Sequence, residues 1–212
     1  MSQYVLSLSL PAVYAESNFI VSSCNDVAYR QIMSWPAWQA LLLSGASGSG
    51  KTHLGHIWMA RANATRLDCR TQSLQPEHIH TNLWLDDAEH CDEEALFHAL
   101  NYTKEKNLSL LITASTPAAQ LPFTLPDLTS RLRALPTAHI EAPDDEVLSA
   151  VLRKQFADRQ IKIPDDVIDY LLTHMERSFS AAQATVEILD HQMLENKRSL
   201  TIPFVRKILS IS

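Results

Sequence analysis

Eight consecutive residues, Gly45 to Thr52, have the types and spacing of a phosphate-binding loop. They form a complete G-x-x-x-x-G-K-[ST] motif. Backbone N–H groups in such a turn converge on an anion only where no Cβ blocks the approach. Lys51 then contacts the β- and γ-phosphates, and the Thr52 hydroxyl ligates Mg²⁺. The residues predicted to bind ATP or ADP are Gly45, Ala46, Ser47, Gly48, Ser49, Gly50, Lys51, Thr52 and His53.

Glycine is scarce everywhere else in the chain. The 212 residues include four glycines, all between positions 45 and 55, where average usage would give about 15. The chain therefore concentrates its flexible backbone at the place where a phosphate must be wrapped.

Two acids follow the phosphate loop at the sequence separation expected for the acidic pair of a nucleotide-hydrolysing site. Asp86 and Asp87 end an apolar segment 35 residues beyond Lys51. We predict that Asp86 contacts Mg²⁺ through water and that Asp87 orients the attacking water. Glutamate is more usual at the second position, so Glu89 is the alternative to Asp87.

Polar and basic residues further along suggest sensors of the nucleotide. Thr113 and Ser115 end the next apolar segment, which we expect beside the phosphate-loop strand, and Ser115 is preferred as the sensor. Arg131 and Arg133 lie on a later helical segment. An arginine there can reach a γ-phosphate across a subunit boundary and stabilise transition-state charge. A surface arginine that pairs with a nearby acid is the other interpretation.

The elements that position these residues alternate between strand and helix. We expect strands over 40–43, 64–68, 83–87, 108–113 and 137–141, and helices over 25–35, 52–62, 93–105 and 127–135. This alternation predicts an α/β fold, with a parallel sheet and helices on both faces. After Pro143 the pattern is purely helical, over about 144–159, 165–175, 180–196 and 202–209. The predicted domains are a tail over 1–13, an α/β domain over 14–142 and a helical lid over 143–212.

Composition narrows the function classes. The net charge is −6, and acids outnumber bases both before Pro143 (13 to 9) and from it onward (11 to 9), which argues against non-specific DNA binding. Three cysteines without C-x-x-C spacing predict reduced thiols in a cytoplasmic protein. Nine histidines show no zinc-site spacing, and neither a signal peptide nor a membrane span is expected. The tryptophans at 35, 38 and 58 are expected in the core.

At this point the residues resemble a family. The order is Asn18-Phe19-Ile20-Val21, the phosphate loop, Leu-Trp-Leu-Asp-Asp at 83–87, Leu-Ile-Thr-Ala-Ser at 111–115, Pro-Asp-Leu-Thr-Ser-Arg-Leu at 126–132 and Leu-Thr-Ile-Pro-Phe-Val at 200–205. Over nearly the whole chain this pattern is similar to the AAA+ module of the bacterial replication initiator DnaA. It is more similar still to the Hda family of DnaA-homologous regulators.

The resemblance implies a partner and a role for several residues. Arg131 becomes a finger that acts in trans on ATP held by DnaA. Residues 7–12 correspond to a peptide that docks on the DNA sliding clamp, although the usual first Gln and last Leu are absent. Phe19, Ile20 and Val21 become adenine contacts. DnaA carries a DNA-binding domain after its lid and this sequence ends at Ser212, so direct sequence-specific DNA binding is not expected.

The chain departs from the family pattern at two sensors of the γ-phosphate. The lid arginine falls near Ser180, with Arg177 one turn earlier as its substitute, and Ser115 replaces an acid or amide. The resemblance therefore implies an AAA+ protein with weak or no turnover of its own, which negatively regulates replication initiation by promoting hydrolysis of DnaA-bound ATP. Assembly into homo-oligomers stays open.

Two other functions stay open. One is a nucleotide-binding adaptor that recruits a replication partner without stimulating hydrolysis. The other is a small P-loop kinase, which is less favoured because 44 residues precede Gly45.

Overall fold

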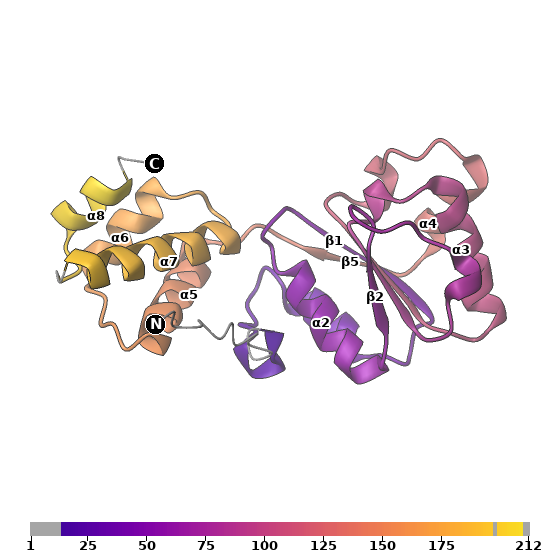
Figure 1. The fold of residues 1–212 in the computed structure, drawn as a ribbon, viewed down its shortest axis with the longest axis horizontal. Coiled ribbons are helices and arrows are strands. Elements are labelled where there is room, and N and C mark those ends of the chain that lie inside the picture. The colour runs from indigo at the N-terminus through magenta and orange to yellow at the C-terminus, as the bar shows by residue number, and fades with distance from the viewer. Residues whose placement is uncertain (1–13, 197–198, 210–212) are drawn as a thin grey trace, which may run out of the picture.

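A computed structural model describes residues 14–196 and 199–209 of the chain. The predicted clamp-binding peptide, residues 7–12, lies outside the described residues. Five parallel strands form one sheet in the order β2-β3-β4-β1-β5 (Figure 1). The strands are β1 (Ala40–Gly45), β2 (Thr65–Asp68), β3 (Leu83–Asp86), β4 (Leu110–Ala114) and β5 (Thr137–Ile140). The predicted parallel α/β sheet is confirmed.

Strand β1, which leads into the phosphate loop, lies between β4 and β5. Leu41 of β1 is in register with Leu111 of β4, and Leu43 is in register with Thr113. The prediction that the strand before Ser115 neighbours the phosphate-loop strand is therefore confirmed. Because the strands are parallel, the residues that follow β1, β3 and β4 meet at one edge of the sheet, where ligands bind in open α/β folds.

Helices cover both faces of this sheet. The helices of the α/β body are α1 (Asp26–Met33), α2 (Lys51–Ala62), α3 (Glu93–Glu105) and α4 (Pro126–Ala134). Leu41 and Leu43 pack with α1 and α2 in one cluster, and Leu42 packs with α3 and α4 in another. Burial on both faces explains why the three inner strands, β1, β3 and β4, are continuous and mostly apolar runs.

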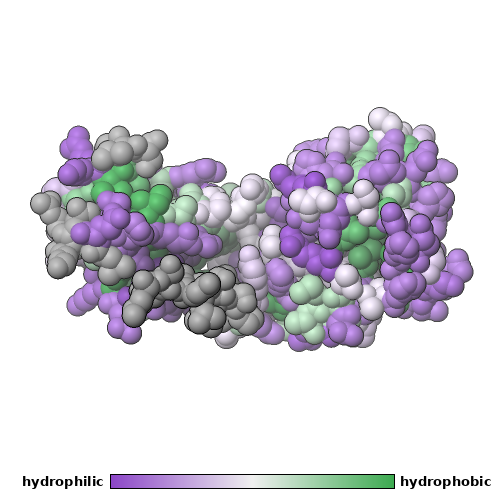
Figure 2. Space-filling view, viewed as in Figure 1, coloured by the Kyte–Doolittle hydropathy of each residue, from purple (hydrophilic) through white to green (hydrophobic). Residues whose placement is uncertain are grey.

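Four more helices form a separate lid beside the sheet (Figure 1). They are α5 (Asp145–Asp158), α6 (Asp165–His174), α7 (Phe179–Asn196) and α8 (Ile202–Leu209), and all four were expected from the sequence. Their apolar faces enclose a core around Phe156, which is fully buried, and Cys24 from the N-terminal segment joins that core. Figure 2 shows a notch between the lid and the α/β body. Among the residues described, no helix is both long and apolar enough to cross a bilayer.

The expectation of three reduced thiols is wrong for two of the cysteines. Cys69 and Cys91 form a disulfide across 22 residues of sequence, and Cys24 is a free, buried thiol. Parallel pairing of β2 with β3 brings the ends of the two strands together, as the hydrogen bond from Cys69 N to the Asp86 carbonyl (3.0 Å) shows. Sequence spacing does not reveal such a pairing. The cytoplasmic location that was inferred from reduced thiols therefore stays a prediction.

The expected tryptophan core is confirmed, and it explains the fourth glycine. Trp38 stacks on Trp58 with ring centroids 5.6 Å apart, beside the fully buried Trp84. A Cβ on Gly55 of α2 would lie 2.2 Å from a ring carbon of Trp84. Only a glycine allows the phosphate-loop helix to approach β3 this closely.

We expect the substitution Gly55→Ala to destabilise the protein. Overpacking a core costs about 1–3 kcal/mol, whereas the better helix propensity of alanine returns at most about 1 kcal/mol. Urea unfolding should therefore show a lower free energy of unfolding for Gly55→Ala. The exposed Arg61 on the same helix supplies the control, because Arg61→Ala should change stability by less than about 0.5 kcal/mol. Equal or higher stability of Gly55→Ala would contradict the packing argument.

Candidate functional site

The phosphate loop between β1 and α2 adopts backbone angles that favour glycine. Gly48 has φ +71° and Gly50 has φ +102°, both in the left-handed region. The loop leads directly into the first turn of α2, which begins at Lys51. A helix N-terminus attracts anions through its unpaired N–H groups and its dipole.

Lys51 and Ser49 place polar atoms inside this loop. The Lys51 ammonium donates to the carbonyl oxygens of Gly45 (2.6 Å) and Ala46 (2.9 Å), and the residue is buried. Burial lowers the pKa of Lys51, while Asp87, Glu89 and Asp86 oppose this shift. The Ser49 hydroxyl oxygen is buried and has no hydrogen-bond partner among the described residues. A concave loop with an ammonium and an unpartnered hydroxyl fits a phosphate group.

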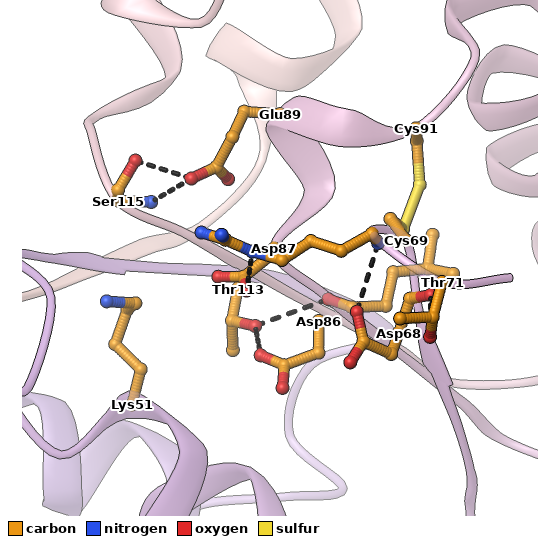
Figure 3. A network of polar contacts seen from close by, with 12 residues as sticks. Lys51, Asp68, Cys69, Thr71, Asp86, Asp87, Glu89, Cys91, Thr113 and Ser115 are labelled. Atoms are coloured by element: carbon orange, nitrogen blue, oxygen red, sulfur yellow. Dashed lines mark hydrogen bonds and ion pairs between the residues drawn. A yellow bond between two sulfur atoms is a disulfide. The ribbon is translucent and has the colours of Figure 1, made fainter.

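The buried Asp86 has hydrogen bonds to both carboxylate oxygens, and Figure 3 shows the one from Thr113. The Arg66 guanidinium donates to Oδ2 from Nη2 (2.7 Å) and from Nε (3.1 Å). The Thr113 hydroxyl donates to Oδ1 (2.5 Å), and Trp84 Nε1 in turn donates to Thr113 (3.2 Å). Asp86 is therefore held in a fixed orientation from both sides.

This arrangement bears on the predicted magnesium site. Asp86 accepts two hydrogen bonds on Oδ2 and one on Oδ1, and a carboxylate has about four acceptor sites. One site on Oδ1 therefore remains for the water of the predicted contact. Thr52, the other predicted ligand, is half-buried at the start of α2. Within 14–196 and 199–209, no group of three or more His, Cys, Asp or Glu residues is arranged to hold a metal ion. The roles of Thr52 and Asp86 toward Mg²⁺ stay predictions.

Asp87 also pairs with an arginine. It has a left-handed backbone conformation (φ +54°), and the Arg70 Nε donates to its Oδ2 at 2.6 Å. Arg66 and Arg70 were not identified as partners from the sequence, because their pairing with the acids depends on the register of β2 against β3. The two predicted acids thus each have an arginine partner, one in the edge strand β2 and one in the loop after it.

Glu89 is placed differently from Asp87. Ser115 donates to Glu89 Oε1 from its hydroxyl (2.5 Å) and its backbone N–H (3.2 Å) (Figure 3). Burial raises the pKa of Glu89, but the hydrogen bonds from the Ser115 hydroxyl and from backbone N–H groups outweigh it and lower the pKa overall. Oε2 is buried without a hydrogen-bond partner in the described part of the chain. Glu89, the alternative to Asp87, therefore has a buried carboxylate oxygen left to accept a bond.

The N-terminal segment lies between the phosphate-loop helix and the lid. A Cβ on Gly50 would lie 3.5 Å from Phe19 Cε2, and the Phe19 ring meets His53 of α2 edge-on at 5.2 Å. Ile20 packs against the lid core, and Val21 is partly exposed (44%). The structure thus brings Phe19 and His53 to the phosphate loop, while contact of this segment with adenine stays a prediction.

The lid contacts the phosphate loop through Ser180 at the start of α7. A Cβ on Gly48 would lie only 2.1 Å from the Ser180 hydroxyl oxygen. Arg177, the predicted substitute for the lid arginine, instead donates to Asp145 at 3.0 Å on the exposed surface of the lid. Ser180, and not Arg177, is therefore the lid residue that contacts Gly48, and the sensor role of Arg177 stays a prediction.

Arg131 lies away from these groups. It belongs to α4, which covers the face of the sheet opposite α2, and its side chain is exposed. Its guanidinium carbon lies 4.9 Å from the centroid of the Phe97 ring of α3. Among the described residues Arg131 forms no ion pair, so the alternative of a surface arginine paired with an acid is not observed. Sequence spacing does not indicate Phe97, because its contact with Arg131 depends on how α3 and α4 pack.

Comparison with solved structures gives the fold. Domain III of the DnaA replication initiation protein from Thermotoga maritima superposes with a TM-score of 0.80 at 17% identity, covering 95% of this chain and 97% of that one. AMPPCP-bound DnaA from Aquifex aeolicus gives 0.71 at 17% identity, covering 89% and 70%. The RuvB Holliday junction branch migration motor from Thermotoga maritima gives 0.68 at 16% identity, covering 89% and 66%.

A comparison with protein families identifies the lid. Residues 144–209, which contain α5 to α8, match the family described as "Hda, lid domain". The match covers the purely helical part of the chain, and the DnaA-like fold accounts for the sheet before it. The chain therefore has a fold similar to that of DnaA domain III, and its helical lid matches the Hda lid family.

Proposed function

We propose that this protein is a nucleotide-binding regulator of chromosomal replication initiation, which promotes hydrolysis of ATP bound to DnaA together with the sliding clamp. The observation that carries the proposal is the exposed Arg131, which has no acidic partner in the described residues and lies on the sheet face opposite the chain's own phosphate-loop helix. The Hda-type lid supports the same assignment.

In this proposal the Arg131 guanidinium acts on the nucleotide of another protein. Negative charge on the γ-phosphoryl oxygens is spread out in the transition state, and an arginine supplied in trans stabilises it. The attacking water and its positioning residue belong to the partner. Residues 7–12 bind the clamp and so bring Arg131 to clamp-associated DnaA.

The protein's own nucleotide is a structural or regulatory ligand, ATP or ADP with Mg²⁺. The phosphate loop with Lys51 holds the phosphates, and Phe19 and Ile20 lie beside the adenine. Turnover at this site is weak because Asp87 is paired with Arg70 and because Ser180 stands at the lid sensor position. The protein acts in the cytoplasm.

We expect Lys51→Met to weaken nucleotide binding. Hydrogen bonds from a charged group are worth about 1.5–3 kcal/mol, so the Kd for ADP should rise roughly 10- to 100-fold. Isothermal titration calorimetry measures this change. Lys106→Met, at an exposed position near the end of α3, should leave the Kd unchanged. Unaltered ADP affinity of Lys51→Met in a folded protein would refute the phosphate-loop assignment.

We expect Arg131→Ala to remove most of the stimulation of hydrolysis, a loss on the order of 10³-fold if this residue is the finger. The assay follows ATP bound to DnaA in the presence of clamp loaded on DNA. Arg133→Ala is the matched control, because Arg133 is also exposed on α4 and has neither an ion pair nor an aromatic partner within the described ranges. Stimulation that survives Arg131→Ala would exclude the finger role.

The adaptor function is the second candidate, and the pairing of Asp86 and Asp87 with arginines favours it over an active ATPase. An adaptor would bind ADP and a replication partner but leave DnaA-bound ATP unchanged. A clamp pull-down that compares the full chain with one lacking residues 1–12 tests the recruitment step separately.

A further inference from the structure

We propose that Phe97 is a positioning residue, which holds the Arg131 guanidinium in the orientation needed to reach a polyphosphate on the partner. This inference rests on the proposed function. It starts from the contact between the two side chains, in which the Arg131 guanidinium carbon lies 4.9 Å from the Phe97 ring centroid. A cation over an aromatic face at this distance is attracted by the ring quadrupole.

The geometry of α3 and α4 makes this contact part of a two-point attachment. At the start of α4, the Glu93 carboxylate accepts hydrogen bonds from Thr124 N (2.8 Å), Thr124 Oγ1 (2.9 Å) and Leu125 N (3.0 Å). Phe97 follows Glu93 by one helical turn on α3, and Arg131 lies nearly two turns beyond Leu125. The Glu93 contact holds the start of α4 against α3, and the Phe97 contact holds the Arg131 side chain.

The Phe97 ring can orient Arg131 because packing against the core restrains the ring itself. It is half-buried and packs against the core cluster between the sheet, α3 and α4. An arginine that stacks on a ring keeps its N–H groups at the edge of the guanidinium plane, where they remain able to donate to phosphate oxygens. An acid in place of Phe97 would occupy those donors. The aromatic contact therefore limits the rotamers of Arg131 without neutralising it.

A second arginine on α4, Arg133, can be compared with Arg131. Arg133 lies two residues further along α4 and is equally exposed, but no aromatic ring in the described residues lies under it. The structure thus distinguishes one oriented arginine from one without such a contact on the same helix.

The test is hydrolysis of DnaA-bound ATP with loaded clamp, measured over a range of concentrations of the full chain. Phe97→Leu should lower the maximal stimulated rate roughly 2- to 5-fold, in line with a cation–π contact at an exposed site, and leave the half-maximal concentration unchanged. Phe97→Tyr, which keeps the ring, should retain the wild-type rate. Phe97→Met serves as a second non-aromatic variant if Phe97→Leu does not fold. ADP affinity and thermal midpoint report on the fold of each variant.

The variants separate failure of this inference from failure of the proposed function. A loss with Arg131→Ala but a wild-type rate with Phe97→Leu or Phe97→Met would overturn the positioning role and keep the finger. An equal loss with Phe97→Tyr and Phe97→Leu would also overturn it, because the ring itself would then be irrelevant. Full stimulation by Arg131→Ala would refute both. Loss in the non-aromatic variants alone, at unchanged ADP affinity, supports the inference.

Discussion

The contact between a helix and a single indole sets much of the geometry of this molecule. Helix α2 lies directly on Trp84 because Gly55 has no side chain. The same indole donates to Thr113, which donates to Asp86. The distance of the phosphate-loop helix from the sheet and the orientation of the first acid are therefore fixed by one buried ring. A larger side chain at position 55 would therefore change both the helix–sheet distance and the orientation of Asp86.

Charge at the edge of the sheet is balanced within the chain. Arg66 pairs with Asp86 and also with Asp68, and Arg70 pairs with Asp87, so each arginine beside the end of β3 has an acidic partner. Glu89 alone among these carboxylates has a buried oxygen without a described partner. Asp86 and Asp87 thus already have cationic partners within the chain. This pairing agrees with the proposal that the reaction of interest takes place on a partner.

Much of the fold was predictable, because buried parallel strands and amphipathic helices leave strong periodic patterns. Helix α3 was expected at its observed bounds, and β4 was correctly placed beside β1. The phosphate loop was readable for the same reason: its chemistry requires particular residues at fixed spacing.

The pairings between segments distant in sequence were not predictable. The disulfide between Cys69 and Cys91, the arginines on the acids and the ring beneath Arg131 all depend on which strands and helices become neighbours and in what register. Arg177 illustrates the same limit. It lies one turn from the expected sensor position, and a nearby acid on α5 determines where it points.

The disulfide closes a covalent ring that begins after β2, runs through β3 and ends after the short helix Ala88–His90. Arg70, Asp86, Asp87 and Glu89 all lie inside it. A crosslink of this kind persists when the chain unfolds and restricts how far the enclosed residues can separate. The acids and Arg70 thus remain within one loop's length of each other when the crosslinked chain unfolds. Their proximity is a property of the connectivity of the chain as well as of its folded state.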